Sequence, residues 1–179
     1  KAHAAPYVMM AWRVAYCKVF YPLAYYCAYF SIRADAFDYE KMAMGRERLE
    51  YYLDIYKAKK ADGTIEKTEL DEYKDMRIVQ EMYARGYEFT PIDIYKAKAR
   101  SFQIIDGKIM PSFKVVSKIG ESAGESIEIA ARGGKFLSKD DLRQRAKIGQ
   151  TVIDKLSELK LLDNYQVASE PDKEKMFRG

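Results

Sequence analysis

The distribution of apolar and polar residues divides the 179-residue chain into segments of different character. Residues 4–32 are almost entirely apolar and aromatic, with six tyrosines and only two charged side chains. Pro22 interrupts the stretch, and proline suits the first turn of a helix but lacks the N–H that a helix interior needs. The pattern predicts two helices, about residues 7–20 and 23–31, that form a buried apolar wall.

Residues 34–86 are charged and have a helical composition. Asp62 and Gly63 form a turn signal between two helical stretches, and Gly86 stands where a C-terminal glycine cap is expected. Charge runs of this kind usually lie on solvated helix faces. The segment therefore predicts charged helices that end near Asp62 and near Gly86.

The helical pattern stops after Gly86. Residues 87–111 contain short runs rich in β-formers, and the prolines at 91 and 111 break any helix. Asp106 and Gly107 lie between two such runs, and this dipeptide is a strong signal for a tight hairpin turn. The sequence thus predicts a mainly α fold with one small β hairpin, which connects two helical regions.

The last third of the chain contains two similar units. In the first, an apolar pair leads to Ile119 and Gly120 and then to a predicted helix at about 121–131. In the second, a helix that Ser138 and Asp141 cap leads to Lys147-Ile148-Gly149 and another helix. Each isoleucine is expected to fill a small core, while each glycine lets the backbone approach a partner closely.

Two such units are typical of tandem helix-hairpin-helix motifs, which hold DNA phosphates with backbone amides at helix starts. The alternative is that each glycine serves only as a turn residue between packed segments. On the first interpretation, residues at the two hairpins are candidate DNA contacts. They are Lys118, Gly120, Glu121, Ser122, Lys147, Gly149, Gln150 and Thr151.

Composition narrows the function classes. An apolar content of 48% can fill a core, and a net charge of +4 permits nucleic-acid binding without requiring it. Cys17 and Cys27 fit neither a disulfide framework nor a zinc site, because His3 is the only histidine, so both are expected to be reduced, buried thiols in a cytoplasmic protein. The same single histidine leaves no constellation for nucleophilic catalysis. The apolar runs are too short for a membrane span.

Several stretches resemble, in order, the bacterial replicative DNA polymerase III alpha subunits of the PolC type. They are KAHAAPYVMMAWRVAYCKVFYPLAYYCAYFSIRADAFD, EMYARGYEFTPIDIYKAKARSFQI, PSFKVVSKIGESAGESI and GGKFLSKDDLRQRAKIGQTVIDKLSEL. The resemblance covers nearly the whole chain apart from residues 54–74 and the tail.

The resemblance implies the end of a fingers region followed by a duplex-binding domain. On this basis residues 1–86 are expected to be a helical fingers segment, and residues 87–111 a β-rich connection. Residues 112–164 are expected to be the tandem helix-hairpin-helix domain, and residues 165–179 a tail.

The family implies a DNA-directed DNA polymerase, a nucleotidyltransferase that requires Mg²⁺ and deoxynucleoside triphosphates. Its palm aspartates run a two-metal reaction and are expected outside this segment, which would then be inactive alone and hold no metal. By resemblance, Lys1, His3 and Tyr7 lie near the incoming nucleotide. They would supply a cation for the triphosphate, an imidazole donor and a ring that packs against base or sugar. The alternative for Tyr7 is a core aromatic at the start of a buried helix.

The expected partners are primer–template duplex and the remaining polymerase domains, palm, thumb and PHP. The sliding clamp is a further partner in the family, but the tail lacks the Gln-x-Ser/x-Leu-Phe ending that usually binds it. The chain begins without methionine and is expected to be part of a larger, cytoplasmic protein without membrane contact. A second hypothesis is a stand-alone DNA-binding module. The apolar wall favours the polymerase, because it needs another domain to cover it.

The chain departs from the family at a few positions. A Gly-x-Gly hairpin usually stands where this chain has Lys118, Ile119 and Gly120, and glycine usually stands at the position of Lys160. Pro6 occupies an alanine position. Where the backbone requires a positive φ, a lysine costs strain that glycine avoids.

Overall fold

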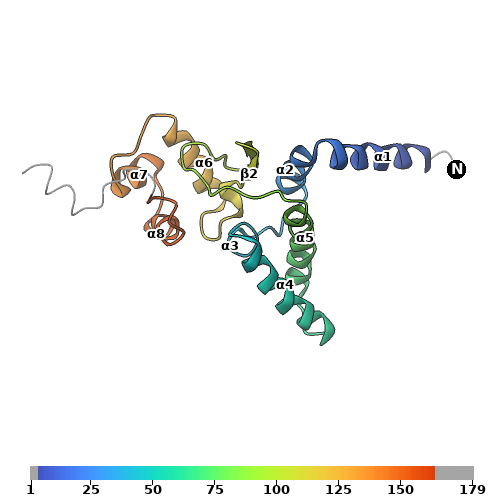
Figure 1. Ribbon diagram of the computed structural model, residues 1–179. Helices are drawn as coiled ribbons and strands as arrows, with labels where there is room; N and C mark the ends of the chain where they lie inside the picture. Colours follow the sequence, from blue (N-terminus) through green and yellow to red (C-terminus); the bar gives the residue numbers. More distant parts are fainter. Residues whose placement is uncertain (1–3, 164–179) are drawn as a thin grey trace, which may run out of the picture.

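The structure is a computed structural model that describes residues 4–163 (Figure 1). Helices dominate, and the only sheet in this part of the chain is a two-stranded antiparallel hairpin, which confirms the predicted fold class. The elements in chain order are α1 (Ala4–Phe20), α2 (Pro22–Ile32), α3 (Tyr39–Met42), α4 (Arg46–Ala61), α5 (Lys67–Ala84), β1 (Gln103–Ile105), β2 (Lys108–Met110), the 3-10 turn η1 (Phe113–Val115), α6 (Gly120–Ala131), α7 (Lys139–Ala146) and α8 (Gln150–Glu158).

The two N-terminal helices form where the sequence predicts them. Pro22 is the first residue of α2, where its missing N–H costs no helical hydrogen bond. Helix α2 packs into the body through Tyr26 and Phe30, whereas α1 projects away from it as a single rod (Figure 1). None of the helices between residues 4 and 163 is both long and apolar enough to cross a membrane.

Helices α4 and α5 lie side by side and form an arm that extends from the body (Figure 1). Buried residues on each helix form the seam between them: Leu49, Leu53 and Tyr56 on α4, and Met76, Val79 and Met82 on α5. The predicted helix ends are confirmed, because Gly63 and Gly86 follow the two helices with φ of 70° and 83°. Positive φ is the conformation that glycine adopts without strain.

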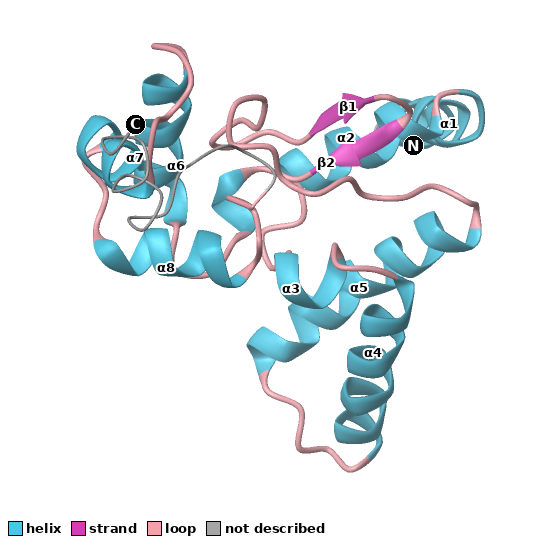
Figure 2. Cartoon of the chain, turned by 60° about the vertical axis from the view of Figure 1, so that its left-hand side comes forward, coloured by secondary structure: helices cyan, strands magenta, loops and turns pink. Residues whose placement is uncertain are grey.

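The predicted β hairpin is also confirmed. Ile104 pairs with Ile109, and Asp106 and Gly107 form the turn with φ of 51° and 75°. Positive φ at both central residues gives the turn whose twist matches that of antiparallel strands. The hairpin lies along α2 (Figure 2) and contacts it through both strands.

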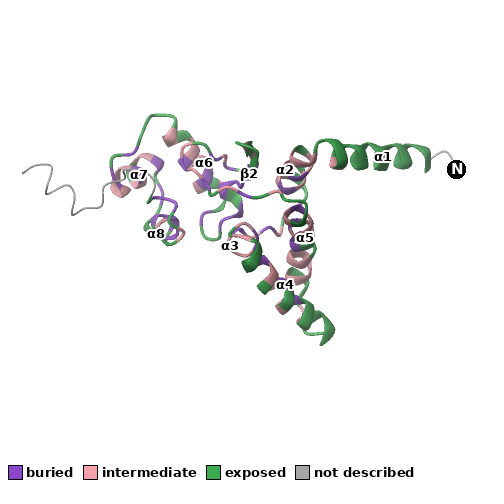
Figure 3. Ribbon diagram, in the orientation of Figure 1, coloured by how far each residue is buried: buried purple, intermediate pink, exposed green. Residues whose placement is uncertain are grey.

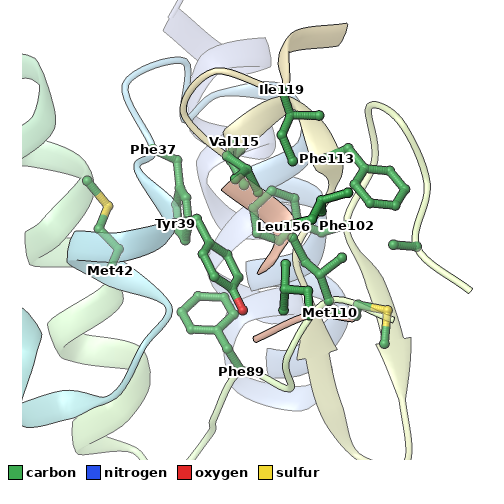
Figure 4. Packing of buried hydrophobic residues seen from close by; sticks show 14 of the residues in the cluster. Phe37, Tyr39, Met42, Phe89, Phe102, Met110, Phe113, Val115, Ile119 and Leu156 are labelled. Atoms are coloured by element: carbon green, nitrogen blue, oxygen red, sulfur yellow. The ribbon is translucent and has the colours of Figure 1, made fainter. Parts of the chain in front are cut away.

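A cluster of aromatic rings joins these parts. Phe30, Phe37, Phe89 and Phe102 contact one another with centroid separations between 5.1 and 6.4 Å. Around them, residues from α3, β2, η1 and α8 complete the core (Figure 4). The buried cluster therefore runs from α2 to the residues after α8. The domain limits expected from the sequence stay a prediction.

The predicted burial of the N-terminal wall is wrong for α1. No residue of α1 is buried, and Trp12 has 74% of its surface exposed (Figure 3). The predicted burial of Cys17 is wrong as well, because this residue is exposed, and Cys27 is half-buried; both thiols are free. The physical reason is that nothing between residues 4 and 163 packs against α1 beyond its junction with α2 and α5.

Candidate nucleic-acid interface

The first hairpin lies between η1 and α6. Lys118 adopts the left-handed conformation with φ of 67°, and Gly120 follows as the first residue of α6 with the same φ. Between them Ile119 is buried, as expected for a residue that fills a small core, and Gly120 is exposed. The segment before this hairpin is a single 3-10 turn, so the first unit is shorter than the second.

The second hairpin lies between α7 and α8. Lys147 ends α7 with φ of 51°, and its backbone N–H donates to the carbonyl oxygens of Arg143 and Gln144. Ile148 is buried and Gly149 is exposed at the start of α8. The two hairpins thus repeat one arrangement of lysine, isoleucine and glycine.

Both hairpins present unprotected helix starts. No side chain caps α6 or α8, so their first backbone N–H groups are available to an outside acceptor. A Cβ added to Gly120 or to Gly149 would meet no atom within 4 Å. Packing inside the described chain therefore leaves open space at both glycines.

Most of the predicted contact residues are exposed. These are Lys118, Gly120, Ser122, Lys147, Gly149, Gln150 and Thr151. Neither lysine of the two hairpins has an ion-pair partner among residues 4–163. Glu121 is the exception, because it is half-buried and its Oε1 lies 2.6 Å from Arg100 Nη2.

Arg145 fixes the connection between the two units. Its guanidinium donates to the carbonyl oxygens of Ala130, Gly134 and Lys135 at 2.7 to 3.1 Å. It also lies 4.5 Å from the ring centroid of Phe136. Because arginine is a planar donor with five N–H groups, one side chain can bind the end of α6 and the connector at once.

Helix α6 is anchored on its other side by Glu128. The carboxylate accepts hydrogen bonds from the backbone N–H of Ala99 at 2.9 Å and from Lys98 and Arg132. The Ala99 N–H and these two cations lower the pKa of Glu128 below its ordinary value. The C-terminal half of α6 is thus held against the segment that contains Lys98 and Ala99.

Ser138 caps α7 as predicted, since its Oγ accepts from the backbone N–H of Asp141 at 3.0 Å. The Asp141 carboxylate accepts from the N–H of Leu137, one residue before the cap. The Asp141 carboxylate therefore has two structural roles, in the helix cap and in an ion pair with Arg145. No group of three or more His, Cys, Asp or Glu side chains that could hold a metal occurs in residues 4–163.

The candidate nucleotide residues lie apart from the hairpins. Lys1 and His3 are outside the described residues. Tyr7 lies on α1 with 74% of its surface exposed, so it is not a core aromatic of this chain. Helix α1 and the α7–α8 unit occupy opposite ends of the molecule (Figure 1), so the structure brings Tyr7 together with none of the hairpin residues.

Sequence reasoning missed two cationic residues that position the site. Arg145 binds carbonyl groups up to 15 residues away, and Lys155 of α8 is buried against Glu40 of α3. Neither partnership has a local sequence signature, because each depends on how distant segments pack.

Comparison with known proteins agrees with these observations. A family described as the helix-hairpin-helix motif matches residues 86–170. The DNA polymerase III PolC-type of Streptococcus pneumoniae D39 is 41% identical over 164 residues, which is 92% of this chain, and that of Streptococcus suis is 43% identical over 162 residues, or 90%. The chain spans 11% of the length of each of these relatives. With the paired hairpins in the structure, these similarities show that the chain is similar to a segment of PolC-type DNA polymerase III.

Proposed function

We propose that this chain is the part of a replicative DNA polymerase that holds primer–template duplex beside the end of the fingers. The observation that carries the proposal is the repeated hairpin, in which Lys118 and Lys147 precede exposed, uncapped helix starts. Backbone N–H groups at a helix start and a nearby ammonium group both favour phosphate oxygens. Such contacts hold the duplex without recognising its sequence.

The rest of the polymerase would cover α1. Soluble monomers rarely expose a large continuous apolar surface, and α1 exposes apolar and aromatic side chains along its whole length (Figure 3). This observation favours a segment packed against palm, thumb and PHP domains over a stand-alone DNA-binding module. The stand-alone module is the second candidate, and the hairpins would serve it equally well.

In the whole enzyme, Lys1, His3 and Tyr7 would face the incoming deoxynucleoside triphosphate, and Mg²⁺ would act at aspartates outside this segment. The exposure of Tyr7 supports this assignment, because its ring is free to contact a ligand or another domain. The chain by itself would then bind duplex but extend no primer. The tail lies outside the described residues and lacks the ending by which such subunits usually bind the sliding clamp.

The test is a titration of duplexes of unrelated sequence with this chain at several salt concentrations. We expect similar affinities for all sequences and an affinity that falls with salt, with a log–log slope of about 0.9 per phosphate contact. Strong dependence on sequence at one salt concentration would reject the phosphate mode. Primer extension by the isolated chain with Mg²⁺ and nucleotides would reject the division of labour.

A further inference from the structure

Each hairpin unit sends one lysine to the same short segment of the N-terminal part. Lys155 of α8 forms an ion pair with Glu40 of α3, and Lys114 of η1 has its Nζ 3.6 Å from Asp35 Oδ1. The two acids are five residues apart in the sequence. The stretch that contains them is therefore the common contact of both units with the N-terminal helices.

The two ion pairs differ in burial. The side chain of Lys155 is 5% exposed, whereas those of Lys114 and Asp35 are 40% and 86% exposed. Lys155 also has Glu158 Oε2 at 3.3 Å, so its ammonium group has two carboxylates in reach. A buried ion pair is strongly sensitive to the loss of one partner, while an exposed pair contributes little.

Apolar packing surrounds the buried pair. Leu156, the next residue of α8, is fully buried and belongs to the same core as Tyr39 of α3 (Figure 4). Such packing holds α8 against α3 but is non-directional. The ion pair adds a fixed direction, because its two charged groups must meet. The Glu40 carboxylate beside it raises the pKa of Lys155, which keeps the ammonium group charged.

We propose that Glu40 and Lys155 form a positioning joint that sets the direction of α8 relative to the N-terminal helices. Gln150, at the start of the same helix, lies five residues before Lys155, or about 7.5 Å along the axis at 1.5 Å per residue. A tilt at the joint therefore moves the second hairpin. The link to DNA synthesis rests on the proposed function, since only a duplex held at that hairpin would transmit the tilt.

The first test measures the joint without DNA. Distance probes are placed on exposed positions of α4 and α7, at Arg48 and Gln144, after replacement of Cys17 and Cys27 by alanine. We expect a single narrow distance distribution in the parent and a broadened or shifted one in Lys155→Met, with helical content unchanged. The exchanged pair, Glu40→Lys with Lys155→Glu, should restore the parent distribution.

Lys114→Met is the matched control, because it removes the exposed pair and should leave the distances unchanged. If Lys155→Met does not fold, Glu40→Gln removes the ionic partner with nearly the same shape. An unchanged distribution in either folded variant overturns the proposal, whatever the DNA measurements show.

The second test uses the full-length polymerase that carries this segment. We expect Lys155→Met to lower the rate of nucleotide addition at saturating duplex about tenfold per active site. A small displacement of the reacting groups lowers the rate of a reaction by this factor or more. The charge-exchanged double variant should recover it. If the parent binds duplex and Lys155→Met adds nucleotides at the parent rate, the proposed positioning role of Glu40 and Lys155 is wrong. If the parent segment does not hold duplex, the proposed function fails instead.

Discussion

Lys118 and Lys147 occupy corresponding positions of the two hairpins and share a left-handed backbone, with φ of 67° and 51°. Each stands two residues before an exposed glycine and has a buried isoleucine as its next neighbour. A lysine in this conformation is strained by about 1–2 kcal/mol. The chain therefore places a charged residue where a glycine would be conformationally easier.

Substitution of either lysine should change stability and duplex binding in opposite directions. Replacing Lys118 or Lys147 by glycine should relieve backbone strain in the folded state, but it also gives the unfolded chain more conformational freedom, which opposes this gain. The net result should be an increase of up to about 1 kcal/mol in the free energy of unfolding. The same change should weaken duplex binding and reduce the log–log salt slope by about 0.9 for each lysine. Denaturant unfolding and salt-dependent binding titrations measure the two effects.

Lys57→Ala on α4 is the control for those two variants, because Lys57 is exposed on the arm formed by α4 and α5, away from the hairpins. It should leave the salt slope unchanged. A Lys118→Gly or Lys147→Gly variant with the parent slope would show that the hairpin lysines do not contact phosphate.

Substitutions at two glycines distinguish a glycine that a DNA phosphate approaches closely from a glycine that is needed for packing inside the chain. Gly149 has φ of −75° and open space around its Cβ position, so Gly149→Thr should fold normally and keep a residue suited to a helix start. Its side chain would occupy the position of the phosphate, and duplex affinity should fall about tenfold, or about 1.4 kcal/mol. Binding titrations at fixed salt provide the measurement.

Gly124→Ala provides the contrast, because its Cβ would lie 2.7 Å from Phe113 Cβ inside the core. That variant should lose about 1–3 kcal/mol of stability through overpacking. Its folded fraction should bind duplex as the parent does. Parent-like affinity in folded Gly149→Thr would mean that the hairpin glycine is only a turn residue.

Asp75 should destabilise the native state at neutral pH. Burial raises the pKa of this carboxyl to about 6, helped by the charges of Asp35 and Asp71 and opposed by hydrogen bonds from the backbone of Ala36 and from Tyr29. An unfolded aspartate titrates near about 3.9. Between these values the folded state binds more protons, so this group lowers stability as pH rises from about 4 to 6.

Asp75→Asn should therefore be more stable than the parent by about 1–3 kcal/mol at pH 7, with the difference shrinking toward pH 4. Denaturant unfolding of both proteins across this range measures the difference. Asp71→Asn is the matched control, because the side chain of Asp71 is 49% exposed and has Lys74 Nζ at 2.7 Å, so it should give no comparable gain. A constant difference between parent and Asp75→Asn at all pH values would contradict the assignment.

The apolar surface of α1 should make the isolated chain associate. Trp12 is the only tryptophan and is exposed, so its fluorescence should shift to shorter wavelength as concentration rises or when the remaining polymerase domains are added. Binding of a hydrophobic dye should decrease in Met10→Lys and Phe20→Lys, which interrupt this surface.

Tyr51→Lys removes an equally exposed aromatic side chain from α4 and should not change dye binding to α1. A monomeric, dye-negative parent chain would favour the stand-alone module over the polymerase segment.

The local features were determined by the sequence itself. Pro22 set a helix boundary, Asp106 and Gly107 set the hairpin turn, and Ser138 set the start of α7, because each acts through its own backbone or that of near neighbours. The repeated Ile-Gly steps likewise marked both candidate DNA contacts before any packing was known.

The tertiary structure alone decided where the segments meet. It left α1 uncovered, bound Arg145 to the end of α6, and buried Lys155 against Glu40. The physical reason is that a short-range pattern records propensity and amphipathicity, whereas burial and ion pairing depend on residues that are distant in the sequence, such as Lys155 and Glu40. A lysine on α8 has the same sequence signature whether it faces solvent or closes a buried pair.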